Sequence, residues 1–245
     1  MEQYFPTTPL KNRVREGSNS EAILPVGEVP GPVYIYDAAT RIWHWVTMLS
    51  IITLCVTGYL IGSPPPAIGG EASFHFMFGM IRLVHFSAGM ILGVFFLLRL
   101  YRVLVGGHHT RQIFWVPFWR LEWYKGLIED VMVYAFLKKP KDFVGHNPLA
   151  HFAMFFMFLI PLVIMLLTGF ALFAEGAGMQ SAWGKVFGWV FVVLGDSMTV
   201  HTVHHACMWV IVLFSMVHMY MATRQDMTQR QTTISAMFSG WRFYR

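Results

Sequence analysis

Histidines are the residues in this sequence whose type and spacing could carry chemistry. The chain has 245 residues and 11 histidines, several of them inside long apolar segments. Ionisable side chains are costly in such surroundings and usually serve a function there. The histidines in apolar segments are His44, His85, His204, His205 and His218. Because imidazole binds metals and carries protons near neutral pH, these side chains indicate a haem or metal site, or a proton path.

Helix geometry selects two histidines on the last apolar segment. His204 and His218 are 14 residues apart, which in an α-helix is about 21 Å along the axis and only about 40° around it. They therefore share one helix face at two depths. The same arithmetic turns His201 about 100° and His205 about 140° away from His218. His205 remains the alternative to its neighbour His204.

Two depth-matched pairs follow when the other segments are added. His44 lies near the start of the first segment, and His85 near the start of the second, which enters the membrane from the opposite side. We therefore expect His44 with His218 on one side and His85 with His204 on the other. Paired imidazoles on facing helices suit two stacked b-type haems, and hydrogen bonds between helices alone would not explain the match in depth. Glycines that would let a porphyrin edge approach are Gly58, Gly89, Gly93 and Gly169.

Four segments are long and apolar enough to position these histidines across a bilayer, which takes about 20 residues. They are residues 42–62, 79–105, 152–174 and 198–221. Pro161 is expected to kink the third helix without ending it. Of all residues, 56% are hydrophobic and 13% are charged, which are too few charges to coat a soluble globule. The predicted fold class is all-α, an integral membrane four-helix bundle, and a soluble enzyme is excluded.

Basic residues gather on one side of this bundle. Lys and Arg are frequent before the first span, between the second and third, and in the tail, whereas residues 63–78 have none and residues 175–197 have only Lys185. The positive-inside rule then places both termini in the cytoplasm and the protein in the inner membrane. The net charge of +5 therefore suits membrane loops rather than nucleic acid. Aromatic residues in 113–136 and 183–194 suit amphipathic helices in the lipid headgroup layer.

Three parts of the chain are expected from these patterns. Residues 1–33 form a polar cytoplasmic segment without the apolar core of a signal peptide, residues 34–226 form the haem-binding domain, and residues 227–245 form a cytoplasmic tail. The chain has two cysteines and no CxxCH motif, so a haem would be held without covalent attachment.

Motifs around the histidines resemble a known family. They are RIWHW (41–45), GYLIG (58–62), IRLVHF (81–86), GHNP (145–148) and HTVHH (201–205), with His218 downstream. From about Tyr34 to the C-terminus, the chain is similar to the cytochrome b subunit of membrane-bound nickel-iron uptake hydrogenases. Related dihaem cytochromes share RxWHW, whereas the ordered set with its loop sequences is specific.

The resemblance implies a subunit that anchors the small and large subunits of a periplasmic nickel-iron hydrogenase and carries their electrons to quinone. The haem ligands of the family fall on His44, His85, His204 and His218. One or two b-type haems would be bound by these histidines, and two are expected. Electrons would enter at the His85/His204 haem and leave from the His44/His218 haem. Hydrogen activation lies on other subunits of the family, and quinone reduction is expected on this chain.

The quinone site is expected at the cytoplasmic side, where its protons are available. A quinone needs an apolar slot, hydrogen-bond donors and access to the bilayer. His146 and Asn147 precede the third span, and Arg41 and Trp43 should lie at a similar depth. An asparagine in the equivalent loop of the related formate dehydrogenase subunit contributes to a quinone pocket. Asn147 and Pro148 also suit a helix start, as N-cap and first helical residue.

The sequence also allows other functions. The cytochrome b subunit of a formate dehydrogenase or related molybdoenzyme shares the four-helix dihaem plan and would copurify with a different partner. A proton or metal transporter would line a pore with histidines, but it needs acidic relay groups, and the four spans contain no Asp or Glu. A bare structural anchor would leave the histidines unexplained.

Overall fold

The computed structural model describes most of the chain. The described residues are 23–24, 32–34, 36–66, 76–105, 113–114, 116, 119–138, 142–143, 148–229 and 232–243. The chain forms two compact units. The four-helix unit comprises Ile42–Arg102 and Ile160–Val212, and the terminal unit comprises Met1–Arg41, Val103–Leu159 and Leu213–Arg245.

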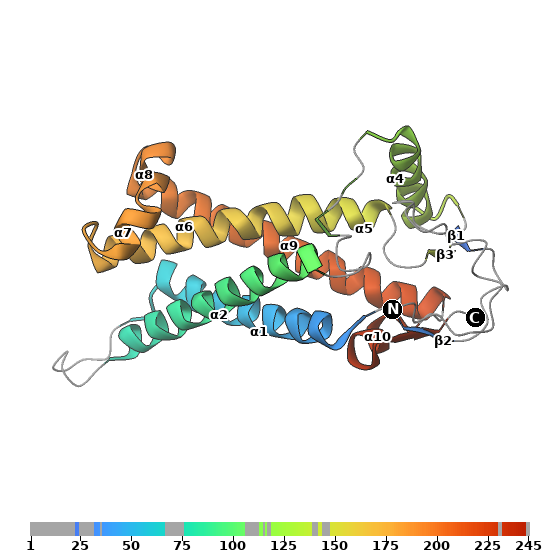
Figure 1. The fold of residues 1–245 in the computed structure, drawn as a ribbon, viewed down its shortest axis with the longest axis horizontal. Helices are drawn as coiled ribbons and strands as arrows, with labels where there is room; N and C mark the ends of the chain where they lie inside the picture. Colours follow the sequence, from blue (N-terminus) through green and yellow to red (C-terminus); the bar gives the residue numbers. More distant parts are fainter. Residues whose placement is uncertain are drawn as a thin grey trace. The chain divides into compact units, whose positions relative to one another are not determined.

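Four long helical segments include the four expected spans (Figure 1). They are α1 (Ala38–Gly62), α2 (Met77–Val105), the segment Pro148–Ala177 and α9 (Ser197–Gln229). Each is long and apolar enough to cross a membrane. Large apolar side chains such as Ile52, Val56 and Leu97 are more than half exposed, as side chains that face lipid would be. The predicted all-α membrane bundle is confirmed.

The third segment changes its hydrogen-bonding pattern before its proline. It consists of α5 (Pro148–Ala153), the π-helical turn η3 (Met154–Leu159) and α6 (Ile160–Ala177). Pro161 has no backbone N–H, and in a regular α-helix its ring would meet the carbonyl of Met157. Met157 lies in the π turn, where the backbone pairs one residue further along the chain. The helix therefore continues through Pro161, as expected.

Two short helices cover the end of α6 within the four-helix unit (Figure 1). They are α7 (Ala182–Phe187) and α8 (Trp189–Leu194), where the sequence indicated one amphipathic stretch. Gly184 permits a tight return of the chain, because a Cβ there would lie 2.2 Å from the carbonyl oxygen of Met179. The buried residues Ala171, Val190 and Val200 join α6, α8 and α9 in one apolar cluster.

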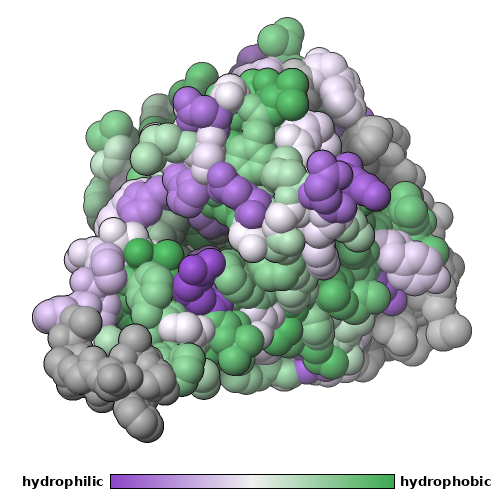
Figure 2. All heavy atoms as spheres, turned by 90° about the vertical axis from the view of Figure 1, so that its left-hand side faces the viewer, coloured by the Kyte–Doolittle hydropathy of each residue, from purple (hydrophilic) through white to green (hydrophobic). Residues whose placement is uncertain are grey.

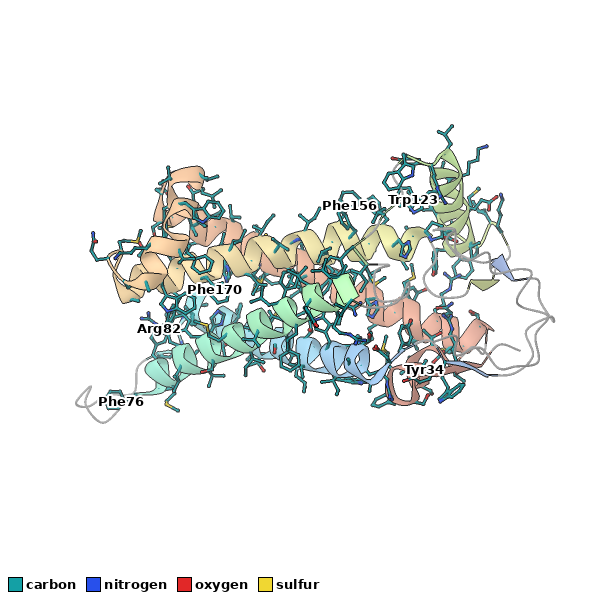
Figure 3. The ribbon with its side chains drawn as sticks, viewed as in Figure 1. Tyr34, Phe76, Arg82, Trp123, Phe156 and Phe170 are labelled. Atoms are coloured by element: carbon teal, nitrogen blue, oxygen red, sulfur yellow. The ribbon has the colours of Figure 1, made fainter. Side chains whose placement is uncertain are left out.

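The packing between α2 and α6 also depends on a glycine. A Cβ at Gly93 would lie 2.7 Å from Cζ of Phe170, so the aromatic ring of α6 fills the place of a side chain on α2 (Figure 3). Nearer the start of α2, Arg82 lies over the ring of Phe86, and Phe86 packs edge-on against Phe173 of α6. Aromatic contacts therefore hold these two helices together.

In the terminal unit, segments from the two ends of the chain pair with each other. Strand β2 (Pro32–Tyr34) is antiparallel to β4 (Trp241–Phe243), with Tyr34 opposite Trp241. The ring of Tyr34 also meets that of Trp241 edge-on at 5.2 Å (Figure 3). A second pair joins β1 (Ile23–Leu24) to β3 (Asp142–Phe143). The expected boundary after residue 33 falls inside β2.

A small core lies beside the β2–β4 pair. Tyr36 packs with Ala236 of α10 (Thr233–Ser239), and both are buried. Burial raises the pKa of the Tyr36 phenol, and the positive charge of the buried Arg242 partly offsets that rise. The N-terminal and C-terminal segments are thus packed into one structure.

Helix α4 (Leu121–Tyr134) lies within the expected amphipathic stretch 113–136 and has two distinct faces. The exposed face carries Leu121, Ile128 and Val131. The opposite face buries Trp123 and Asp130, as Figure 3 shows for the first of them. An apolar exposed face is what a helix in the headgroup layer presents to lipid.

Asp130 and Gly126 of α4 hold the start of α5. The backbone N–H of Leu149 donates to Oδ2 of Asp130 at 3.2 Å, which satisfies one of the unpaired donors at the helix N-terminus. Gly126 lets the ring of Pro148 approach, because a Cβ there would lie 2.9 Å from Cγ of that ring. The start of the third membrane segment is thus fixed from α4.

Candidate functional site

The histidines selected from the sequence lie on three of the long helices. His44 is in α1, His85 is in α2, and His204, His205 and His218 are in α9. By unit, His85 and His204 belong to the four-helix unit together with His44, whereas His218 belongs to the terminal unit. The contacts of His85 and His204 can therefore be compared within one compact body.

A threonine of α1 holds the ring of His85. Oγ1 of Thr57 lies 2.9 Å from Nδ1 of His85. The same hydroxyl donates to the carbonyl oxygen of Thr53, one turn earlier on α1, at 2.7 Å. Thr57 is buried, so water does not compete for its hydroxyl. A side chain of α1 thus orients an imidazole that belongs to α2.

A threonine of α6 holds the ring of His204 in the same way. Oγ1 of Thr168 lies 2.9 Å from Nδ1 of His204 and donates to the carbonyl oxygen of Ile164 at 2.7 Å. Thr168 is only 1% exposed. The two arrangements thus have the same atoms and the same distances, and together they use all four long helices.

A glycine follows each of these threonines and gives the imidazole its place. A Cβ at Gly58 would lie 3.2 Å from Cε1 of His85, and one at Gly169 would lie 3.1 Å from Cε1 of His204. Both distances are tighter than ordinary contacts, so the rings lie where a larger residue would press on them. Gly58 and Gly169 were expected to make room for a cofactor, and in this structure they face the histidines.

Sequence reasoning missed Thr57 and Thr168. The signal that could have found them is a repeated pattern of aliphatic residue, threonine, glycine and aromatic residue. It occurs as VTGY at 56–59 in the first span and as LTGF at 167–170 in the third. Hydroxyl residues in apolar helices often bond only to their own backbone, so a threonine in a span does not by itself indicate a partner on another helix.

The surroundings of His204 and His205 differ. His204 is half-buried, and its Nδ1 lies 2.9 Å from the hydroxyl of Thr168. His205 is exposed, lies near Gly62 of α1, and meets the ring of Trp209 at 6.2 Å. These contacts favour His204 over His205 as the partner of His85.

Each of the other two expected ligands has aromatic neighbours in its own unit. The ring of His44 meets that of Trp45 edge-on at 5.3 Å. The ring of His218 stacks on Phe214 at 5.4 Å, and Phe214 stacks on Phe158 of η3 at 5.2 Å. The pairing of His44 with His218 stays a prediction.

The quinone candidates fall into two groups. His146 and Asn147 lie outside the described residues. The guanidinium of Arg41 donates to the carbonyl oxygen of Phe238 in α10. Trp43 lies under the guanidinium of the buried Arg99, 4.8 Å from its ring centroid. Helix α5 begins at Pro148, as expected for proline at a first helical position.

The donor set around His85 and His204 fits an axial ligand pair for haem. Two imidazoles belong to one compact helical unit, and each is bound at Nδ1, which leaves Nε2 for a metal. The neighbouring glycines remove the side chains that would crowd the rings. Imidazole pairs of this kind, on facing helices of a bundle, are typical of cofactor sites built from side chains.

Comparison with known proteins agrees with this chemistry. The sequence profile of the prokaryotic cytochrome b561 family matches residues 35–240. The "probable Ni/Fe-hydrogenase B-type cytochrome subunit" of Rhizobium leguminosarum bv. viciae is 52% identical over 214 residues, which are 87% of this chain and 90% of that protein. The protein of the same name from Azotobacter vinelandii is 50% identical, covering 87% of this chain and 89% of its own length. The "probable Ni/Fe-hydrogenase 1 B-type cytochrome subunit" of Escherichia coli K12 is 42% identical, covering 86% and 91%. The resemblance inferred from the sequence is confirmed, and the chain belongs to the prokaryotic cytochrome b561 family.

Proposed function

We propose that this protein carries electrons from a periplasmic nickel-iron hydrogenase to quinone in the inner membrane. The names of its relatives support a Ni/Fe-hydrogenase partner. The small and large subunits of that hydrogenase are the partners that we propose for this chain. The four apolar helices support a membrane location. The excess of Lys and Arg in the loops on one side supports cytoplasmic termini. A transporter function has no comparable support, since the spans contain no acidic relay residue.

Membership of a b-type cytochrome family implies b-type haem. When bound, such a haem supplies a carrier that accepts and releases one electron at a time. His85 and His204 would hold one haem through their Nε2 atoms, with Thr57 and Thr168 fixing the rings from the other side. His44 and His218 would hold a second haem. The observation that carries the proposal is the first pair: two half-buried histidines from different helices of one compact unit, each held at Nδ1 by a buried threonine.

The outer end of the four-helix unit supports docking of a partner. Figure 2 shows apolar side chains gathered around a few polar ones on the face that includes this end. Helices α7 and α8 contribute Val186, Trp189 and Val192, all at least half exposed. Exposed apolar surface beside polar groups is typical of an interface with another protein or with lipid headgroups. The hydrogenase would bind at this end.

Quinone reduction is proposed at the opposite, cytoplasmic side. The candidate residues are Arg41 and Trp43 at the start of α1, and His146 and Asn147, which come just before the third segment in the sequence. The cation of Arg99 over Trp43 gives that part of α1 a fixed polar group beside an apolar ring. Protons for the reduced quinone would then come from the cytoplasm.

Haem quantification on the purified, detergent-extracted protein tests the ligand assignment. A pyridine haemochrome assay should find two b-type haems per chain. His85→Ala and His204→Ala should each remove the same single haem, because the two imidazoles would hold the same iron. His205→Ala is the matched control, and it should keep the full haem content. A haem-free wild-type protein, or loss of haem in the His205 variant with full retention in the His204 variant, would contradict the assignment.

Copurification from membranes tests the electron donor. We expect the nickel-iron subunits to copurify and hydrogen to reduce a quinone analogue in the isolated complex. A molybdenum-containing partner would instead support the formate dehydrogenase alternative.

Replacing His146 and Asn147 separately with Ala tests the quinone site. The quinone reaction should slow in these variants. Hydrogen-dependent reduction of a dye that accepts electrons from the hydrogenase itself should be retained.

A further inference from the structure

Thr57 and Thr168 each make a contact with a histidine in addition to the backbone hydrogen bond that is usual for a threonine in a helix. Thr53 of α1 shows the ordinary behaviour of a threonine in a helix: its hydroxyl donates to the carbonyl oxygen of Leu49 at 2.9 Å and is partly exposed. Thr57 and Thr168 make the same kind of backbone bond and in addition lie 2.9 Å from a histidine nitrogen. The second contact is directed at the site.

The direction in which each threonine hydroxyl donates its proton determines which tautomer of the neighbouring histidine is present. A threonine hydroxyl has one proton to donate and two lone pairs to accept with, and a carbonyl oxygen can only accept. At Thr57 the proton is therefore given to Thr53, and the oxygen accepts from Nδ1–H of His85. At Thr168 the proton is given to Ile164, and the oxygen accepts from Nδ1–H of His204. Both rings thus carry their proton on Nδ1 and present the lone pair of Nε2.

We propose that Thr57 and Thr168 are positioning residues that fix the tautomer and the rotation of the two histidine ligands and raise their donor strength toward iron. This inference rests on the proposed function, because it takes His85 and His204 as haem ligands. A hydrogen bond accepted from the far nitrogen makes a ligating imidazole more basic. A more basic ligand stabilises the ferric form over the ferrous form, so the two hydroxyls lower the reduction potential of the haem between them.

Gly58 and Gly169 further restrict the rotation of the two histidine rings. The threonine hydroxyl lies beside Nδ1 of each imidazole, and Cε1 lies within 3.2 Å of the place that a Cβ on the glycine would take. The ring therefore has little freedom to turn away from its hydrogen bond. Because the threonine and the glycine are adjacent on one helix, a single turn of α1 or α6 sets both constraints.

Threonine-to-valine variants remove the hydroxyl and nearly keep the shape of the side chain. The experiment compares T57V, T168V and the double variant with T53V. The hydroxyl of Thr53 donates to the carbonyl oxygen of Leu49, so T53V loses only that bond on α1. T57S and T168S restore the hydroxyl. The readouts on the purified protein are haem content, the potentiometric midpoint of each haem, and the electron paramagnetic resonance spectrum of the ferric protein.

The valine variants should raise the midpoint of one haem only, change its low-spin spectrum, and weaken haem retention by about 10–100-fold. The serine variants and T53V should resemble the wild type. If T57V and T168V match T53V in all three readouts, or if serine fails to restore what valine removes, the inference is overturned while the proposed function stands. A wild-type protein without haem would instead overturn the proposed function.

Discussion

At the scale of single residues, chemistry and packing are combined in one dipeptide. Thr57-Gly58 and Thr168-Gly169 each supply a hydrogen bond and a space to a histidine on another helix. The histidines themselves could be predicted, because an imidazole in an apolar segment is conspicuous. The threonines could not, because Thr202 and Thr228 have the same local backbone bond without any histidine partner. Their role depends on which helices are neighbours, and sequence spacing does not contain that information.

The glycines offer a separate test at this scale. Gly58→Ala or Gly169→Ala would place a methyl group 3.2 or 3.1 Å from a histidine ring, so the ring must shift and strain its bond to threonine. We expect lower haem content in both variants. Gly79→Ala in α2 is the control, because nothing lies within 4 Å of the place that its Cβ would take. All three substitutions favour the helix by up to about 1 kcal/mol. Haem loss in the control as well would show that ring contact is not the cause.

At the scale of elements, the four spans could be predicted well and their ends less so. Long apolar runs are visible in the sequence because a bilayer requires them. Helix α9 continues to Gln229, eight residues beyond the expected end at 221, because a helix can continue into water where its apolar run stops. The strands β2 and β4 could not be predicted, since each has only three residues and their partners are some 200 residues apart in the chain.

Asp130 provides the prediction at the element scale. Its buried carboxylate accepts a hydrogen bond from Leu149 at the start of α5, and a bond to a charged group contributes about 1.5–3 kcal/mol. Asp130→Ala should therefore lower the midpoint of thermal unfolding. Its neighbour Glu129 lies 3.7 Å from Lys138 on the surface, where an ion pair contributes about 0–1 kcal/mol, so Glu129→Ala should change little. Equal midpoints in the two variants would show that Asp130 does not stabilise the helix start.

At the scale of the whole molecule, the pairing of β2 with β4 restricts the topology. Strands from the two ends of the chain can pair only if both ends lie on the same side of the membrane. Four spans give that result, because an even number of crossings returns the chain to its starting side. The terminal core of Tyr36 and Ala236 contains residues from both ends of the chain. We propose from the basic loops that this side is the cytoplasmic one.

Cysteine labelling tests this topology in intact cells. Ser235 of α10 and Gln180, which precedes α7, are both exposed. A thiol reagent that does not cross the membrane should therefore label a cysteine at either position, provided that the position lies on the outer side. Gln180→Cys should be labelled in intact cells, because Gln180 lies in the connection with few basic residues. Ser235→Cys should be labelled only after the membrane is opened, because α10 belongs to the terminal unit with both chain ends. The native Cys55 and Cys207 are first replaced by serine to remove background labelling. Labelling of Ser235→Cys in intact cells would reverse the orientation, and with it the sides proposed for the hydrogenase and for quinone protonation.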